Sequence, residues 1–95
     1  MVVVGTEIIE DFVKRHPECA QELAELVRDL RASRFLDPNA LKARYPAVKI
    51  IDGTTAVFKV RGNKYRLTAT TAYKNQVLVV RALESHAKYD RRRLK

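Results

Sequence analysis

The fold of this chain is decided by one stretch, Val57-Phe58-Lys59-Val60-Arg61-Gly62-Asn63-Lys64-Tyr65-Arg66-Leu67. On both sides of Gly62-Asn63, apolar and charged residues alternate, which is the period of a β-strand whose successive side chains point to opposite faces. Gly62-Asn63 is a two-residue hairpin signal of the kind that begins with glycine. The stretch therefore predicts a β-hairpin with its tip at these two residues.

A turn of two residues fixes which strand residues lie opposite each other. The predicted pairs are Arg61 with Lys64, Val60 with Tyr65, Lys59 with Arg66, and Phe58 with Leu67. One face then supplies core side chains, namely Ala56, Phe58, Val60, Tyr65, Leu67 and Ala69. The other face carries the cations Lys59, Arg61, Lys64 and Arg66. Like charges placed opposite each other destabilise a sheet, and a bound phosphate would offset their repulsion.

Further strands flank the hairpin. The period-2 pattern predicts strands at Val48–Ile51, Thr55–Arg61, Lys64–Tyr73 and Val77–Glu84. They follow one another too closely for crossover helices, so we expect an antiparallel meander. If Asn75-Gln76 is the last turn, Arg81 faces Thr70 and joins the cationic face. A three-residue loop would point Arg81 into the core, which is improbable for an unpaired arginine.

The segment before the meander predicts a first strand at Met1–Gly5 and two amphipathic helices. Thr6 is expected to cap a helix that begins at Glu7. The apolar stripes of the two helices are Ile8, Ile9, Phe12 and Val13, then Leu23, Leu26, Val27 and Leu30. The predicted fold class is α+β, with a short N-terminal strand and two amphipathic helices packed on a twisted antiparallel β-sheet. Ninety-five residues form one such domain, 1–95.

The charge is distributed unequally along the chain. Residues 1–38 hold five Lys/Arg and eight Asp/Glu, whereas residues 39–95 hold fourteen and three, giving net charges of −3 and +11. Such an asymmetry indicates a nucleic-acid partner. We expect no membrane partner, because no apolar stretch approaches the roughly 18 residues of a membrane span. A single cysteine, Cys19, fits a reducing cytoplasm.

A candidate reactive segment, Ser85-His86-Ala87-Lys88-Tyr89-Asp90, follows the last predicted strand. His86 can take or give a proton near neutral pH, Tyr89 offers an aromatic face, and Asp90 could orient either neighbour. Alone, this segment would indicate only a surface histidine, but it lies beside the cationic face. We expect no metal and no cofactor, because no Cys/His/Asp cluster has metal-ligand spacing and the cations would repel Mg²⁺.

Three stretches resemble the HigB-type toxins of type II toxin–antitoxin pairs, which belong to the wider RelE-like group. The stretches are Leu41–Pro46, Val57–Leu67 and Val79–Asp90. The G-N-K-Y-R-L turn combined with the H-x-x-Y-D ending is the specific part of the pattern. Two mild departures are Phe35, near which the family commonly has tryptophan, and Ser85, where it has threonine.

The resemblance implies a RelE-like fold and a ribosome-dependent, metal-independent mRNA interferase, neutralised by a HigA-type helix-turn-helix antitoxin. The ribose 2′-hydroxyl would attack the adjacent phosphate and leave a 2′,3′-cyclic phosphate. The implied catalytic residues are Lys64, Arg66 and Arg81 for charge stabilisation, His86 as general acid or base, and Tyr89 to stack on or orient a base. The implied RNA-binding residues are Lys59, Arg61, Asn63 and Asp90.

Two other functions fit the residues. A non-catalytic RNA- or ribosome-binding module would use the same cationic sheet without cleavage. A small DNA-associated regulator is less consistent, because the chain has no recognition-helix pattern and both long helices are acidic overall.

Overall fold

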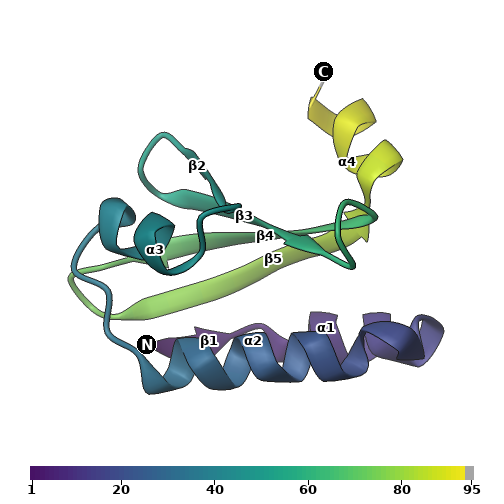
Figure 1. Ribbon diagram of the computed structural model, residues 1–95, viewed down its shortest axis with the longest axis horizontal. Coiled ribbons are helices and arrows are strands. Elements are labelled where there is room, and N and C mark those ends of the chain that lie inside the picture. Colours follow the sequence, from purple (N-terminus) through teal and green to yellow (C-terminus); the bar gives the residue numbers. More distant parts are fainter. Residues whose placement is uncertain (94–95) are drawn as a thin grey trace.

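The computed structural model describes residues 1–93 and is shown as a ribbon in Figure 1. Its elements are β1 (Val2–Val4), α1 (Thr6–Arg15), the short 3₁₀ helix η1 (Pro17–Cys19), α2 (Ala20–Ala32), α3 (Pro38–Arg44), β2 (Lys49–Ile51), β3 (Thr55–Val60), β4 (Tyr65–Ala72), β5 (Val77–Ser85) and α4 (His86–Arg93). The predicted α+β class is confirmed: α1 and α2 form a layer along one face of a five-stranded sheet.

The sheet has the strand order β1-β5-β4-β3-β2 and is mixed. The meander from β2 to β5 is antiparallel, as predicted. The expectation of a wholly antiparallel sheet is wrong, because β1 runs parallel to β5. No hairpin connects β1 to its neighbour, so no turn fixes its direction. The chain instead crosses the helical layer and the whole meander before β5 returns beside β1.

The central hairpin has the predicted register. The Cα partners include Val60 with Tyr65, Lys59 with Arg66, and Phe58 with Leu67. Because side chains alternate along each strand, Phe58 and Leu67 enter the core while Lys59 and Arg66 lie on the other side. We call this other side, opposite α1 and α2, the outer face.

The hairpin tip departs from the prediction at Arg61. Its φ of 54° lies in the left-handed region, and the amide of Lys64 donates to its carbonyl at 3.2 Å. The Arg61 amide also turns toward α2 and donates to the Glu22 carboxylate, at 3.0 and 3.2 Å to its two oxygens. Arg61 and Lys64 therefore belong to the turn, and they do not continue the strand alternation.

The connection between β4 and β5 is longer than predicted. The strands pair up to Ala72 and Val77, so a four-residue loop replaces the two-residue turn expected at Asn75-Gln76. The side-chain amide of Gln76 explains the difference, because it contacts the backbone of Phe35 twice. It accepts from the Phe35 amide at 3.1 Å and donates to the Phe35 carbonyl at 2.6 Å. A contact across 41 residues thus decides this loop.

A β-bulge in β5 changes the predicted position of Arg81. Thr70 pairs with Val79 instead of with Arg81, which has no Cα partner at the bulge. Both registers place Arg81 on the outer face, and its Nε donates to the Thr70 hydroxyl at 3.0 Å. The extra residue also turns Leu83 toward the core side.

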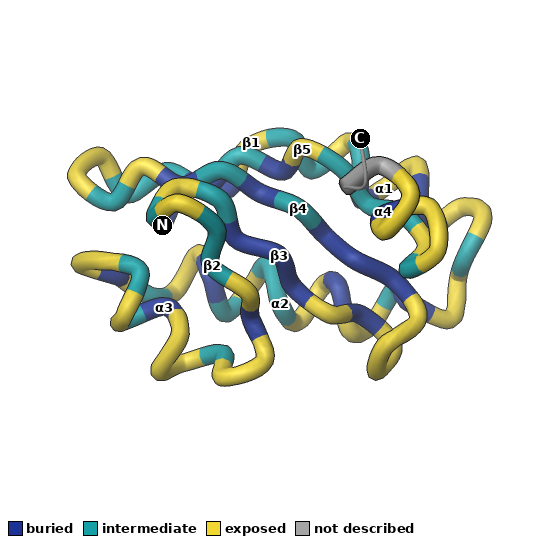
Figure 2. Tube along the Cα trace, turned by 90° about the horizontal axis from the view of Figure 1, so that it is seen from above, coloured by how far each residue is buried: buried dark blue, intermediate teal, exposed yellow. Residues whose placement is uncertain are grey.

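Buried residues form one core between the helical layer and the sheet. Its members include Ile9, Phe12, Leu23, Leu30, Phe58, Val60, Leu67 and Val80. The buried positions follow β3 and β4 through the middle of the molecule in Figure 2. No helix within residues 1–93 is long and apolar enough to cross a bilayer.

The start of α1 is set by Gly5. The expectation that Thr6 caps a helix beginning at Glu7 is wrong, because Thr6 is already helical and Gly5 occupies the cap position with φ of 88°. A Cβ at Gly5 would come within 2.7 Å of the Val80 carbonyl oxygen. The strand-to-helix turn therefore needs glycine for its conformation and for the close approach to β5.

Helix α4 was not predicted, and it continues through Arg93. Leu94 and Lys95 lie outside the described residues. The Ser85 hydroxyl caps α4 by accepting from the Lys88 amide at 3.1 Å, and the His86 amide donates to the Lys64 carbonyl at 2.9 Å. Figure 1 shows α4 on the side of the sheet away from α1 and α2.

A carboxylate joins α2 to the end of α3. Asp29 accepts a hydrogen bond from the Tyr45 hydroxyl and another from Arg44, the latter at 2.8 Å. The Tyr45 bond, followed by the Arg44 bond, lowers the pKa of the Asp29 carboxyl. Burial and this carboxylate together raise the pKa of the Tyr45 hydroxyl, so the phenol remains a donor. This junction fixes the segment that leads into β2.

We predict that Asp29→Asn lowers the stability by about 1 kcal/mol at neutral pH, or about 4–8 °C in Tm. Because folding lowers this pKa, the stabilisation is complete above the pKa of the unfolded carboxyl and is lost as the pH falls through the folded value. Thermal unfolding from pH 7 down to pH 2.5 should therefore show the two proteins converging in acid. Asp11→Asn is the charge-matched control, since its exposed pair with Arg15 at 3.5 Å should contribute little. Equal losses in both variants would contradict the assignment.

Candidate functional site

A small pocket of about 210 Å³ lies on the outer face, beneath α4. We call it the cationic pocket, and its lining residues are Ala47, Lys49, Val57, Lys59, Arg66, His86, Tyr89 and Asp90. Three segments build it: the residues leading into β2, the β3–β4 hairpin, and α4. The pocket brings together five of the nine residues predicted as site residues, namely Lys59, Arg66, His86, Tyr89 and Asp90.

Arg66 lies deepest among the cations, with only 7% of its surface exposed. Its guanidinium donates to the Asn63 side-chain oxygen at 2.6 Å, to the Asn63 carbonyl at 3.2 Å and to the Tyr65 carbonyl at 3.3 Å. Glu84 is its Cα partner in β5. The hairpin turn therefore holds the Arg66 side chain in one orientation at the wall of the pocket.

Two lysines complete the positive charge of the pocket. Lys59 is the cross-strand partner of Arg66, as predicted, and its side chain is exposed. Lys49 was missed by the sequence analysis. Strand alternation could have identified it, because Val48 is a buried core residue and the next residue in a strand points to the opposite face. The two lysines and Arg66 make this pocket suited to a phosphate group.

His86 and Asp90 form a pair along one side of α4. The His86 Nε2 lies 2.9 Å from the Asp90 Oδ2, at the i,i+4 spacing of a helix. The His86 Nδ1 is buried and has no hydrogen-bond partner within the described residues. A proton on Nε2 would be donated to the Asp90 carboxylate. The accessible edge of the pair is thus Nε2 and the Asp90 carboxylate.

Tyr89 forms part of the pocket wall and is only 5% exposed. Its neighbours there include the buried Val57 and Arg66. We expected an aromatic face open for stacking on a base, and in this structure the ring is covered. It can still define the shape of the pocket.

Arg61 and Lys64 lie at the hairpin tip, outside the lining of the cationic pocket. The Lys64 Nζ is 5.6 Å from the ring centre of Tyr65, whose own side chain packs on the helix side of the sheet. A backbone hydrogen bond lowers the pKa of Glu18, and the charges of His16, Lys64 and Arg61 act in the same direction. The hairpin tip therefore lies near the acidic start of the helical layer.

Arg81 and Asn63 occupy intermediate positions. Arg81 lies on the outer face beside Thr70, but it does not line the pocket. Asn63 does not line it either, and it reaches the site only through its two contacts with Arg66. Of the nine predicted residues, five thus line the pocket and Asn63 supports it from the turn. Arg61, Lys64 and Arg81 are cations that lie outside the pocket.

The pocket places the positively charged side chains of Lys59 and Arg66 beside the His86–Asp90 pair. Preorganised donors stabilise developing negative charge, and a histidine–carboxylate pair can move a proton between oxygen atoms. Among residues 1–93, no group of three or more His, Cys, Asp or Glu side chains could hold a metal ion.

Comparison with known proteins identifies similar sequences. Residues 19–92 match the model of the HigB toxin family, described as the RelE-like toxic component of a toxin–antitoxin system. Curated relatives include the mRNA interferase toxin HigB of Escherichia coli and the mRNA interferase HigB of Shigella flexneri. Each is 28% identical to this chain over an alignment of 93 residues, and the alignment covers 95% of this chain and 88% of the relative.

We predict that Ser85→Ala loosens α4 without unfolding the domain. Losing a serine cap costs about 1 kcal/mol, so the open state of α4 should become roughly five times more populated. Amide hydrogen exchange across residues 88–91 measures this directly. Ser85→Thr keeps the hydroxyl acceptor and should exchange like the wild type. Equal acceleration in both variants would show that the hydroxyl bond does not hold the helix.

Proposed function

We propose a function from one premise: the chain belongs to the HigB family, the RelE-like toxic components of toxin–antitoxin systems. The relatives are named mRNA interferases, and we assign the same activity to this chain. It is an endoribonuclease that cuts messenger RNA and is neutralised by an antitoxin. The observation that supports this most is the cationic pocket, where Arg66 and Lys59 lie beside the His86–Asp90 pair.

In this proposal the scissile phosphate lies between the side chains of Lys59 and Arg66. The ribose 2′-oxygen attacks the adjacent phosphorus, and the bond to the 5′-oxygen breaks. The products are a 2′,3′-cyclic phosphate and a 5′-hydroxyl. Both cations neutralise the charge of the pentavalent transition state, where fixed electrostatic stabilisation is worth most. The step needs no metal ion.

Proton transfer is assigned to the accessible edge of the His86–Asp90 pair. The proton of the 2′-hydroxyl enters this pair, and the leaving 5′-oxygen takes a proton from it. The net change is one proton moved from one oxygen to the other. Tyr89 shapes the wall against which the nucleotide is oriented. This replaces the open stacking role expected from the sequence.

The outlying cations Arg61, Lys64 and Arg81 are assigned to the RNA backbone on either side of the cut. A pocket of about 210 Å³ holds little more than the reacting phosphate. We therefore assign the alignment of the messenger RNA to the ribosome. Holding the reacting groups in the right geometry lowers the activation barrier, and so small a protein cannot provide all of this alignment alone. Such a toxin acts in the cytoplasm, and we assign its antitoxin to the HigA helix-turn-helix type.

Asn63 has a different role from the RNA contact expected from the sequence. Its side-chain oxygen and its carbonyl both accept from the Arg66 guanidinium, at 2.6 and 3.2 Å. We assign Asn63 as a positioning residue that acts through Arg66. Guanidinium orientation affects the transition state more than it affects RNA binding, so Asn63 should influence the rate of cleavage more than affinity.

We predict that His86→Ala and Arg66→Ala each reduce mRNA cleavage at least about 100-fold. Mapping of new RNA ends in a translating extract measures the rate. Arg15→Ala is the matched control, because Arg15 lies on α1 and pairs only with Asp11 among the described ion pairs. Thermal unfolding separates lost chemistry from lost folding for Arg66, and Arg66→Lys retains the charge in a folded background.

A non-catalytic RNA- or ribosome-binding module makes a different prediction. The wild type and His86→Ala would then bind ribosomes alike, and neither would produce new RNA ends. Binding of His86→Ala to single-stranded RNA should show a log–log salt slope of roughly −3 for four or five phosphate contacts. A slope near zero would remove the RNA surface from both functions.

We predict that Asn63→Ala slows cleavage about tenfold at saturating ribosomes and leaves ribosome affinity within about twofold, since it loosens one charge-stabilising donor. Asn63→Asp keeps the side-chain acceptor and should restore most of the rate. Asn75→Ala, in the exposed β4–β5 loop, is the matched asparagine control. If Asn63→Ala weakened binding and left the maximal rate unchanged, Asn63 would be an RNA contact after all.

A further inference from the structure

The turn between β3 and β4, residues 61–64, is bonded to elements on both sides of the sheet. In Figure 1 it lies between α2 and the start of α4, and hydrogen bonds join it to each of them. On the helix side, the Glu22 carboxylate accepts from the Arg61 amide, at 3.0 and 3.2 Å to its two oxygens. On the outer side, the Lys64 carbonyl accepts from the His86 amide at 2.9 Å. The turn therefore links α2 to the first residue of α4.

The same turn holds both halves of the candidate site. Asn63 accepts two hydrogen bonds from the Arg66 guanidinium, at 2.6 and 3.2 Å. The next residue, Lys64, anchors the start of α4 through its carbonyl. Because Asn63 and Lys64 are consecutive in the chain, a change in the conformation of the turn alters the position of Arg66 relative to His86.

The conformation of the turn needs support at Arg61. Its φ of 54° lies in the left-handed region, which costs free energy for a residue that carries a Cβ. Two bonds hold it there, because its amide donates to Glu22 and its carbonyl accepts from the Lys64 amide at 3.2 Å. Within residues 1–93, Glu22 is the one residue of α1 or α2 that hydrogen-bonds to the turn.

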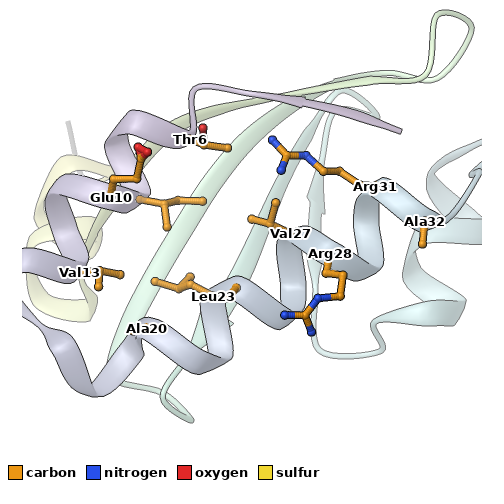
Figure 3. A pocket seen from close by; sticks show the side chains of 11 residues that line it. Thr6, Glu10, Val13, Ala20, Leu23, Val27, Arg28, Arg31 and Ala32 are labelled. Atoms are coloured by element: carbon orange, nitrogen blue, oxygen red, sulfur yellow. The ribbon is translucent and has the colours of Figure 1, made fainter.

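The Glu22 carboxylate is presented from a fixed part of α2. The neighbouring Leu23 is completely buried, and Figure 3 shows its side chain directed into the space between α1 and α2. Glu22 itself lines a different groove, together with Lys59 and Val60, the last two residues of β3. A helix anchored in the core thus holds an acceptor at the point where β3 enters the turn.

We propose that Glu22 is a positioning residue for cleavage, which acts through the hairpin turn on Arg66 and His86. This inference rests on the proposed function, since it gives Glu22 a part in the reaction at the cationic pocket. Glu22 does not line that pocket, so its replacement leaves the lining side chains in place. Their misorientation affects the transition state more than the bound substrate, and the loss should therefore fall on the rate of the chemical step.

Replacement of Glu22 tests this role. Glu22→Ala should slow cleavage about tenfold at saturating ribosomes and leave ribosome affinity within about twofold. Glu22→Gln keeps an oxygen that accepts from the Arg61 amide, so it should cut within about threefold of the wild-type rate. Glu25→Ala is the matched control and should cut like the wild type. It removes the same charge from the exposed surface of α2, where Glu25 accepts from Gln21 of the same helix at 3.2 Å.

A double-mutant cycle tests whether the turn is the route. Asn63→Ala alone should slow cleavage about tenfold. If Glu22 acts through the same turn, Glu22→Ala combined with Asn63→Ala should slow cleavage about 10- to 30-fold, whereas independent effects would multiply to about 100-fold. Because Glu22 is exposed, the variants should stay folded, and thermal unfolding measures this.

Hydrogen exchange follows the link without any cleavage, at the amides of Arg61, Lys64 and His86. Each amide should exchange at least about fivefold faster in Glu22→Ala and at the wild-type rate in Glu25→Ala. Unchanged exchange at the His86 amide would show that Glu22 does not hold the start of α4.

Cleavage by Glu22→Ala at the wild-type maximal rate would overturn the proposal. Equal losses in Glu22→Ala and Glu22→Gln would also overturn it, because the charge of the carboxylate and not its hydrogen bond would then matter. A loss of about 100-fold in the double variant would contradict the route through the turn. Absence of cleavage by the wild type would instead refute the proposed function, and exchange at the His86 amide would then decide the structural link by itself.

Discussion

The pairing of Lys59 with Arg66 across the central hairpin is the constraint on which the other parts of the structure depend. The same register that places Phe58 and Leu67 in the core brings these two like charges side by side on the outer face. Like charges side by side cost stability, and the turn supplies acceptors at Asn63 to the Arg66 guanidinium, while Glu84 is the partner of Arg66 in the next strand. A surface built this way is suited to a phosphate, which would complete the neutralisation. The core and the candidate site are thus consequences of one register.

Helix α4 converts this charged surface into a site with defined shape. It begins where β5 ends, and its first turn is held by the Ser85 hydroxyl and by the Lys64 carbonyl. The helix then carries His86 and Asp90 to the edge of the cationic pocket and lays Tyr89 over its wall. Because the hairpin supplies the anchoring carbonyl, the position of the His86–Asp90 pair depends on the same turn that orients Arg66.

The parts that the sequence predicted correctly are those decided by neighbours in the chain. The turn signal at Gly62-Asn63 and strict alternation predicted the Lys59–Arg66 pairing and the core face. The remaining features depend on contacts between distant residues, which a single sequence does not display. The length of the β4–β5 loop is determined by the hydrogen bonds between Gln76 and Phe35. The parallel direction of β1 is not determined by any turn, because no hairpin joins β1 to β5. Arg61 does not lie on the predicted cationic face, because its amide donates a hydrogen bond to Glu22. Helix α4 was not predicted because its sequence has no apolar stripe at helical spacing.

We propose that the cationic pocket cuts RNA through the ribose 2′-hydroxyl. The most direct test is a messenger RNA with a single 2′-deoxynucleotide immediately 5′ of the mapped cut, presented to the wild-type protein on translating ribosomes. We expect this RNA to be bound normally and not to be cut there, while the all-ribose RNA yields 2′,3′-cyclic phosphate ends. Cleavage of the deoxy-substituted RNA at the same position and rate would rule out attack by the 2′-hydroxyl.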